Sequence, residues 1–134
     1  DTHGGRARRR FHTGGIVREA SDAYPSLFED ALPAFRRVLA QRACVTTASF
    51  AMMARLMQTI DDTTTLHRGG IEGLERVRRD GRALEQLTAE GGDCVAFLER
   101  LNHDYKRLNL TIGGVADMLG VAFGCLIAGN EITP

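Results

Sequence analysis

The sequence predicts an all-α fold, an antiparallel helical bundle of about five to six helices. From residue 16 onward, apolar residues recur at three- and four-residue spacing, and no segment shows the strict alternation of a half-buried strand. The connections between these segments are short, which favours antiparallel packing of sequential helices. A chain of 134 residues with 43% hydrophobic residues can fill one core.

The first two helical segments differ in how much of their surface is apolar. Ser26 is expected to cap a short turn, after which Pro33 kinks or restarts a helix that runs to Gln41. The second helix, residues 46–60, is apolar nearly all round: Phe50, Met52, Met53, Leu56, Met57 and Ile60. A helix of this kind is buried on most sides, so we expect it to be central.

Two polar breaks separate the remaining helices. The first reads DDTTTLHRGG over residues 61–70, and a third helix is expected to start near Ile71 and end before Gly91-Gly92. The fourth helix carries Cys94, Phe97, Leu98, Leu101, Tyr105 and Leu108 at helical spacing. The second break, NLTIGG over residues 109–114, precedes a strongly apolar last helix.

Composition narrows the class of protein. The 17 basic and 17 acidic residues balance, which gives no reason to expect nucleic acid or a membrane surface as a partner. All the basic residues except Lys106 are arginines, which suit phosphate groups, although codon bias in a GC-rich genome is the favoured explanation of their number. Three scattered cysteines are typical of reduced thiols, and the most apolar stretch, residues 115–128, is shorter than the roughly 18 to 20 residues of a membrane span. We expect a soluble, cytoplasmic protein.

The chain opens with DTHGGRARRRFHTGG and no methionine. We expect residues 1–15 to form a flexible, Arg/Gly-rich loop ahead of an all-α domain over residues 16–134. Its arginines either contact phosphate or form a solvated charge run. This opening is expected of a fragment, a processed subunit or a chain clipped at an interdomain loop.

The first polar break combines groups that bind metal and phosphate. Asp61 and Asp62 are hard oxygen ligands of the type that Mg²⁺ accepts, with hydroxyls from Thr63 onward. Arg68 before Gly69 and Gly70 suits a phosphate, because glycines let the backbone approach closely at a helix N-terminus. His67 is placed to move a proton or to donate to a phosphate oxygen. The alternative is structural: Asp and Thr cap the next turn, Gly-Gly turns the chain, and the histidine is a packed structural residue.

The second break repeats the pattern. Asn109 and Thr111 precede Gly113 and Gly114, and Asp117 follows one turn later on an apolar helix. A carboxylate there either faces solvent or pairs with a cation or metal. The alternative is an ordinary first-turn acid that favours the helix dipole.

Three strings together resemble one family, the triphosphoribosyl-dephospho-CoA synthases. The string TIDDTTTLHRGGIEGL (59–74) is similar to an internal family motif, through Asp62-Thr63, Arg68-Gly69-Gly70 and Gly73-Leu74. The string NLTIGGVADMLG (109–120) resembles the family's closing Asn-Leu-Ser-Pro-Gly-Gly-Ser-Ala-Asp-Leu-Leu, and residues 18–35 resemble its Glu-Ala, Tyr-Pro and Ala-Leu-Pro pattern. The departures are Thr111-Ile112 for Ser-Pro, Val115 for serine, and Thr64 where asparagine is common. The family's N-terminal stretches have no counterpart here, so the resemblance implies the C-terminal half of a larger all-α enzyme.

The resemblance implies transfer of a 5-triphosphoribosyl group from ATP to the 2′-hydroxyl of 3′-dephospho-CoA, with release of adenine. The product is the prosthetic-group precursor for the acyl carrier subunit of citrate lyase or malonate decarboxylase. It implies Asp62, helped by Asp61, as Mg²⁺ ligand or base, and Asp117 as a group that orients metal or ribose, with His67 a further catalytic candidate. The phosphates would contact Thr63, Arg68, Gly69, Gly70, Asn109, Gly113 and Gly114.

Two other functions fit the same residues. A Mg²⁺-dependent ADP-ribosyl-type glycohydrolase also uses Asp-Asp-Thr clusters. A non-catalytic nucleotide-binding or assembly half would need a partner chain, or the missing N-terminal half, to complete its site, and a homo-oligomer is compatible with either. Every version requires that the acidic turn and the glycine turn open onto one pocket. Asp62 and Asp117 on opposite sides of the bundle would exclude the site.

Overall fold

In the computed structural model, residues 24–133 are described, and they form helices and connecting segments without a strand. A π-helical segment, η1 (Ser26–Ala31), continues directly into α3 (Leu32–Arg42). They are followed by α4 (Val45–Thr59), α5 (Thr63–Glu90), α6 (Cys94–Arg107) and α7 (Gly113–Ala128). The prediction of an all-α fold with about five to six helices is confirmed.

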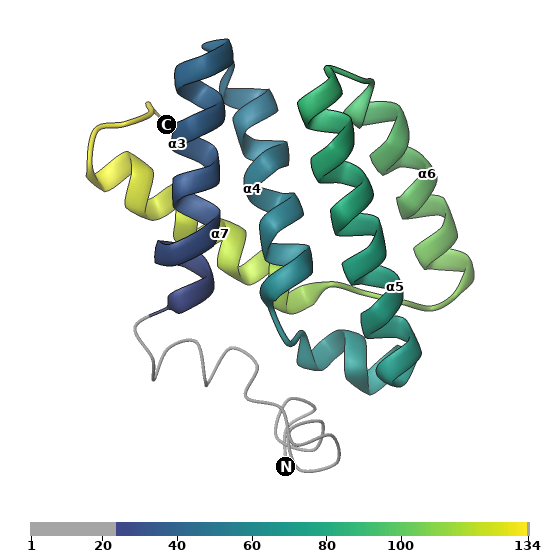
Figure 1. Cartoon of the computed structure of the whole chain (residues 1–134). Helices are drawn as coiled ribbons and strands as arrows, with labels where there is room; N and C mark the ends of the chain where they lie inside the picture. Colours follow the sequence, from purple (N-terminus) through teal and green to yellow (C-terminus); the bar gives the residue numbers. More distant parts are fainter. Residues whose placement is uncertain (1–23, 134) are drawn as a thin grey trace.

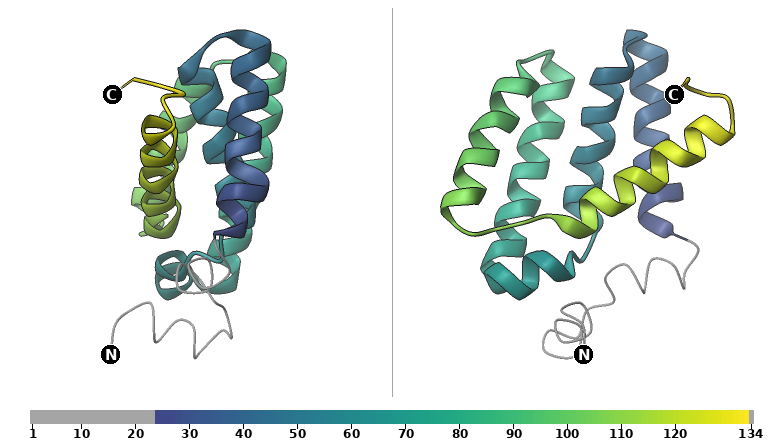
Figure 2. Two further views of the ribbon diagram at one scale, coloured as in Figure 1. Left: turned by 90° about the vertical axis from the view of Figure 1, so that its left-hand side faces the viewer. Right: turned by 180° about the vertical axis from the view of Figure 1, so that it is seen from behind.

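The helices pack in two layers (Figures 1 and 2). α3, α4 and α5 lie side by side with alternating directions, α6 packs against α5, and α7 crosses behind α3 and α4. α4 contacts η1, α3, α5 and α7, which confirms its predicted central place. Its buried face supplies Ala48, Ala51, Met52, Ala54, Leu56 and Met57 to the core.

The first polar break differs from its prediction, because it is helical rather than an open loop. α5 already begins at Thr63, capped by Asp62, and the chain bends at Gly70. Gly70 has φ 64° and ψ −160°, a backbone conformation that residues with a Cβ rarely adopt. The short first section therefore lies across the end of the bundle, and the long section rises beside α4 (Figure 1).

The start of the first helix also differs from its prediction. Pro25, not Ser26, precedes the helix and makes no side-chain capping bond. Pro33 lies at the start of α3, directly after η1, so the helix passes from π-helical to α-helical form next to this proline.

Charged side chains join neighbouring helices at their edges. Arg55 of α4 bonds Asp30 of η1 and Glu85 of α5. The three cysteines are free thiols, as predicted, and Cys94 is buried. In the described part of the chain, no helix combines the length and the apolar character needed to cross a membrane.

Candidate functional site

The two polar breaks meet in space. The hydroxyl of Thr64 accepts a hydrogen bond of 2.9 Å from the backbone N–H of Gly113, and the hydroxyl of Thr65 donates to the carbonyl oxygen of Thr111. A third bond runs from the backbone N–H of Val115 to Oδ2 of Asp62, at 3.0 Å. The turn before α5 and the turn before α7 therefore form one unit, although 49 residues separate Thr64 from Gly113.

Asp62 is the centre of this unit. Its side chain is buried, with 1% of the residue exposed. Oδ1 accepts bonds from the N–H of Thr64 (3.0 Å), the hydroxyl of Thr64 (2.6 Å) and the N–H of Thr65 (3.2 Å). Together with the Val115 bond, one carboxylate satisfies donors at the N-termini of both α5 and α7, where the helix dipoles favour negative charge.

Gly113 and Gly114 are required by this close contact. A Cβ atom at Gly114 would lie 3.0 Å from Cγ of Asp62 and 3.2 Å from each of its oxygens. A Cβ at Gly113 would lie 2.9 Å from Oγ1 of Thr64. The second glycine pair thus lets α7 approach the buried carboxylate.

The first glycine pair has a different local role. A Cβ at Gly69 would lie 2.7 Å from Cδ1 of Leu110, so Gly69 allows the segment before α7 to pack on the short section of α5. Nothing lies within 4 Å of the Cβ position at Gly70, whose positive φ makes the bend.

Asp61 has a more open environment than Asp62. Its carboxylate forms an ion pair with Arg78 of α5, and the Asp61 side chain is 25% exposed. The Nε atom of Arg78 is buried and has no hydrogen-bond partner among the described residues. No sequence motif marked Arg78, because its partner is 17 positions away and the contact depends on how α5 bends back past the end of α4.

The other predicted phosphate groups lie at the edges of the unit. Arg68 donates to Oδ1 of Asn109 at 3.3 Å, which is a fourth hydrogen bond between the two breaks, and both residues are exposed. His67 is also exposed and lies one helical turn after Thr64, while Thr63 at the start of α5 is partly buried. Asp117 is exposed and lies one turn of α7 beyond Gly114, so it is not on the opposite side of the bundle from Asp62.

A second polar cluster, which the sequence did not indicate, joins α5 to α6. The hydroxyl of Tyr105 donates to Oδ2 of Asp80 at 2.7 Å, and Arg76 bonds both that oxygen and Asp104. Burial, followed by the bond to Asp80, raises the pKa of the Tyr105 phenol well above its ordinary value. This cluster holds α6 in place beside the unit formed by the two breaks.

The described carboxylates do not form a ready-made metal site. Among residues 24–133, no group of three or more His, Cys, Asp or Glu side chains is placed to hold a metal ion. Asp62 already accepts four hydrogen bonds, and a carboxylate offers about four lone-pair sites. Mg²⁺ is often held by one or two carboxylates together with waters and substrate phosphates. Asp61 and Asp117 are both less buried than Asp62.

The arginine-rich opening, residues 1–15, lies outside the described residues, as do residues 18–23 of the stretch 18–35.

Comparison with known proteins gives a consistent result. A family model described as ATP:dephospho-CoA triphosphoribosyl transferase matches residues 1–131. The chain is 32% identical over 114 residues, 85% of its length, to a protein of Streptococcus equi subsp. zooepidemicus. It is 35% identical over 122 residues, 89% of its length, to a protein of Pseudomonas paraeruginosa. Both are described as "Probable 2-(5''-triphosphoribosyl)-3'-dephosphocoenzyme-A synthase".

The chain spans 38% of the length of the Streptococcus relative and 41% of the Pseudomonas relative. No solved structure matches the chain.

Proposed function

The chain belongs to the ATP:dephospho-CoA triphosphoribosyl transferase family, and we propose that the full-length protein transfers the 5-triphosphoribosyl group of ATP to the 2′-hydroxyl of 3′-dephospho-CoA. In this reaction a bond forms between the 2′-oxygen of the acceptor and C1′ of the ATP ribose. The bond between C1′ and adenine breaks, the hydroxyl proton passes to a base, and adenine leaves after taking up a proton. The product serves as the prosthetic-group precursor of an acyl carrier protein, in a citrate lyase or malonate decarboxylase system.

The observation that supports this proposal most is the direct contact between the turn before α5 and the turn before α7. Both predicted phosphate-binding strings, 61–70 and 109–114, lie against each other and are joined through Asp62. Asp62 and Thr64 already accept hydrogen bonds from the backbone N–H groups at the starts of α5 and α7, so a triphosphate would bind at the edge of this unit, where Arg68 is exposed. Because the chain spans about two fifths of its relatives, other parts of the full-length protein would complete the enclosure of the substrates.

We assign Asp62 a positioning role. Its oxygens are buried and engaged by the backbone of both turns, so it fixes the relative place of α5 and α7. Asp61 and Asp117 are the carboxylates that would hold Mg²⁺, which supplies charge screening for the triphosphate when bound. His67 is exposed one turn after Thr64, and we propose it as the base for the acceptor hydroxyl, since imidazole is the side chain that most often accepts protons in catalysis.

Arg68 is the proposed triphosphate ligand. Its bond to Asn109 is exposed and at 3.3 Å, so exchanging the amide oxygen for a phosphate oxygen costs little. A guanidinium binds phosphate through two parallel bonds, which are stronger than one bond to a neutral amide. Arg78 has an unsatisfied buried Nε beside Asp61 and is a second candidate donor.

The test is an assay of the full-length protein with MgATP and dephospho-CoA, with adenine and the coupled product followed by chromatography and mass spectrometry. We expect stoichiometric adenine and triphosphoribosyl-dephospho-CoA, and loss of turnover when Mg²⁺ is chelated. Supplying an ADP-ribosylated peptide instead tests the glycohydrolase alternative. The proposal would be overturned if no adenine were released from ATP in the presence of dephospho-CoA, or if the protein turned over only the ADP-ribosylated peptide.

Variants assign the roles. His67→Asn is expected to lower kcat about 100-fold or more, the range of general-base contributions. Asp61→Asn is expected to raise the Mg²⁺ concentration needed for half-maximal rate. Asp93→Asn is the matched control, because Asp93 is the exposed capping aspartate at the start of α6. Near-normal turnover in His67→Asn would remove that residue from the mechanism.

A further inference from the structure

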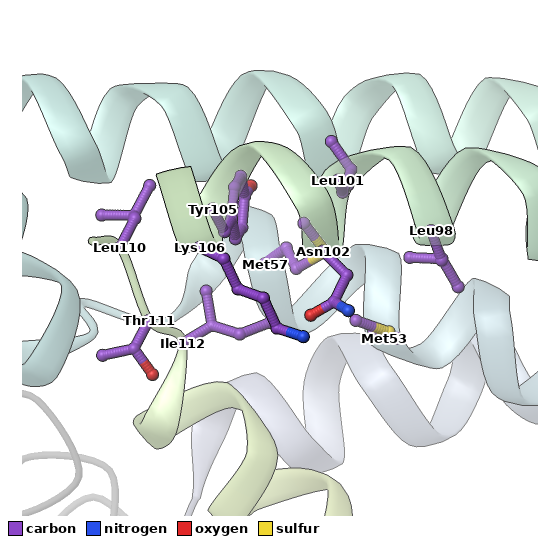
Figure 3. A pocket seen from close by; sticks show the side chains of 10 residues that line it. All are labelled: Met53, Met57, Leu98, Leu101, Asn102, Tyr105, Lys106, Leu110, Thr111 and Ile112. Atoms are coloured by element: carbon purple, nitrogen blue, oxygen red, sulfur yellow. The ribbon is translucent and has the colours of Figure 1, made fainter. Parts of the chain in front are cut away.

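A groove of 270 Å³ opens between α4, α6 and the segment that joins α6 to α7 (Figure 3). Met53 and Met57 of α4 form one side, and Leu98 and Leu101 of α6 form another. In the rear view of Figure 2, α6 and α7 diverge from the segment between them, and among the described helices α7 crosses only one end of α4 on this side. None of the residues proposed to bind Mg²⁺ or triphosphate, or to act as base, lines this groove.

The groove has an apolar lining and a polar rim. Asn102 and Lys106 lie one turn apart on α6 and extend over the groove from the same helix (Figure 3). Lys106 is the one lysine in the sequence. Thr111 adds a hydroxyl at the end nearest α7. The lining thus offers methylene and thioether surface in the middle, and an amide, an ammonium and a hydroxyl around it.

The groove shares a wall with the unit formed by the two polar breaks. Leu110 lines the groove and also packs against Gly69, and Thr111 lines it while its carbonyl oxygen accepts the Thr65 hydroxyl bond. Asn109, the preceding residue, bonds Arg68. A second substrate lying in the groove would therefore be separated by this one segment from the triphosphate proposed at Arg68.

The size of the groove selects the part of a substrate that fits. Its volume lies just below the roughly 300 to 1,000 Å³ that is usual for pockets enclosing a whole small molecule. A complete dephospho-CoA, with its nucleotide and pyrophosphate, would exceed it, whereas a slim chain would not. The pantetheine arm of dephospho-CoA is a slim chain of this kind. It has methylene groups, a dimethyl carbon and two amides, which match flexible methionine surface and a side-chain amide.

We propose that this groove receives the pantetheine arm of the dephospho-CoA acceptor. Met53, Met57 and Leu98 contact the apolar parts of the arm, and Asn102 bonds one of its amides. Lys106 lies at the rim, where it faces the pyrophosphate that joins the arm to the nucleotide. This inference rests on the proposed function, and it makes α6 the element that selects the acceptor.

The experiment uses the full-length protein and fills the groove. Leu98→Trp places a ring in the groove, and Val95→Trp is the matched control, because Val95 is 53% exposed on the same helix and does not line the groove. In Leu98→Trp we expect the KM for dephospho-CoA to rise about tenfold or more through lost apolar contact, with the KM for ATP unchanged. Lys106→Met, an exposed position, should raise the same KM without altering the melting temperature.

Pantetheine itself is the second probe. It should inhibit competitively against dephospho-CoA but not against ATP, and Leu98→Trp should weaken this inhibition while Val95→Trp does not. An unchanged acceptor KM in Leu98→Trp would overturn the inference and leave the proposed function standing. So would a lower melting temperature without a KM change, which would make the groove a packing surface for the rest of the protein.

If the unmodified protein releases no adenine, the proposed function fails, and calorimetry with pantetheine still tests whether the groove binds the arm. Binding that Leu98→Trp abolishes supports the inference, and absence of binding overturns it.

Discussion

The carboxylate of Asp62 and the backbone N–H of Val115 form a hydrogen bond of 3.0 Å across 53 residues of chain. The same carboxylate caps α5 through Thr64 and Thr65. One buried side chain therefore sets where the last helix begins relative to the bend in α5. The groups proposed to bind triphosphate are brought together by this contact.

Removing the Asp62 carboxylate should destabilise the chain more than removing an ordinary cap. In Asp62→Ala, three backbone donors lose their partner in a buried place, so we expect a loss of about 3 kcal/mol in the free energy of unfolding. Asp93→Ala is the control, because Asp93 is an exposed cap whose carboxylate accepts a hydrogen bond from the N–H of Ala96, and its loss should cost about 1 kcal/mol. Urea unfolding measures both. Equal losses would contradict the bridging role of Asp62.

Gly114→Ala tests the close approach of α7. The new methyl group would lie 3.0 to 3.2 Å from the buried carboxylate, so α7 must shift, and we expect a loss of about 1 to 3 kcal/mol. Gly120→Ala lies on the same helix with no atom within 4 Å of its Cβ position. That control should gain up to about 1 kcal/mol from helix propensity. The result that would contradict this account is a gain in both variants, measured by thermal or urea unfolding.

Tyr105 should make the stability of the chain fall at alkaline pH. Its folded pKa is raised by burial first and then by Asp80, so the folded chain keeps the phenol proton while the unfolded chain releases it. A raised folded pKa contributes stability below the unfolded value, and this is lost progressively as pH rises past about 10. Urea midpoints between pH 8 and 11 measure the effect. Tyr105→Phe should flatten the alkaline part of the profile, and an identical slope in both proteins would show that Tyr105 is not responsible.

Helical periodicity was sufficient to predict most of the fold. The apolar spacing around Met52 and Met57 predicted the buried central helix, and the spacing from Cys94 to Leu108 predicted α6. It missed the helix from Thr63 to Gly69, because those residues are mostly polar and carry no apolar stripe. The helical signal there is the cap, an aspartate followed by Thr64 and Thr65, which the sequence offered as one of two alternatives.

The sequence predicted which segments form the site, but it did not predict which atoms of these segments contact each other. The strings around Asp62 and Gly114 were both identified, but one sequence does not show which atoms face each other. Burial of Asp62 at 1% exposed follows from the packing of α7 and not from any local pattern. The Asp61–Arg78 and Asp80–Tyr105 pairs were missed for the same reason, since periodicity gives the face of a helix and not its partner.

Arg68→Ala separates binding from stability. Both Arg68 and its partner Asn109 are exposed, so the substitution should change the free energy of unfolding by less than about 0.5 kcal/mol. In the full-length protein it should raise the KM for ATP about tenfold or more, the size of one charge-assisted contact. Arg37→Ala, an exposed arginine of α3, is the matched control and should leave both quantities unchanged. An unaltered KM in Arg68→Ala would remove this residue from the triphosphate site.

Backbone hydrogen exchange of the full-length protein with and without MgATP tests the central claim most directly. If the two turns hold one triphosphate, ATP should slow exchange in residues 62–69 and 111–117 together, with the same dependence on ATP concentration. Protection of one turn without the other, or of neither while ATP binds elsewhere, would contradict the shared site.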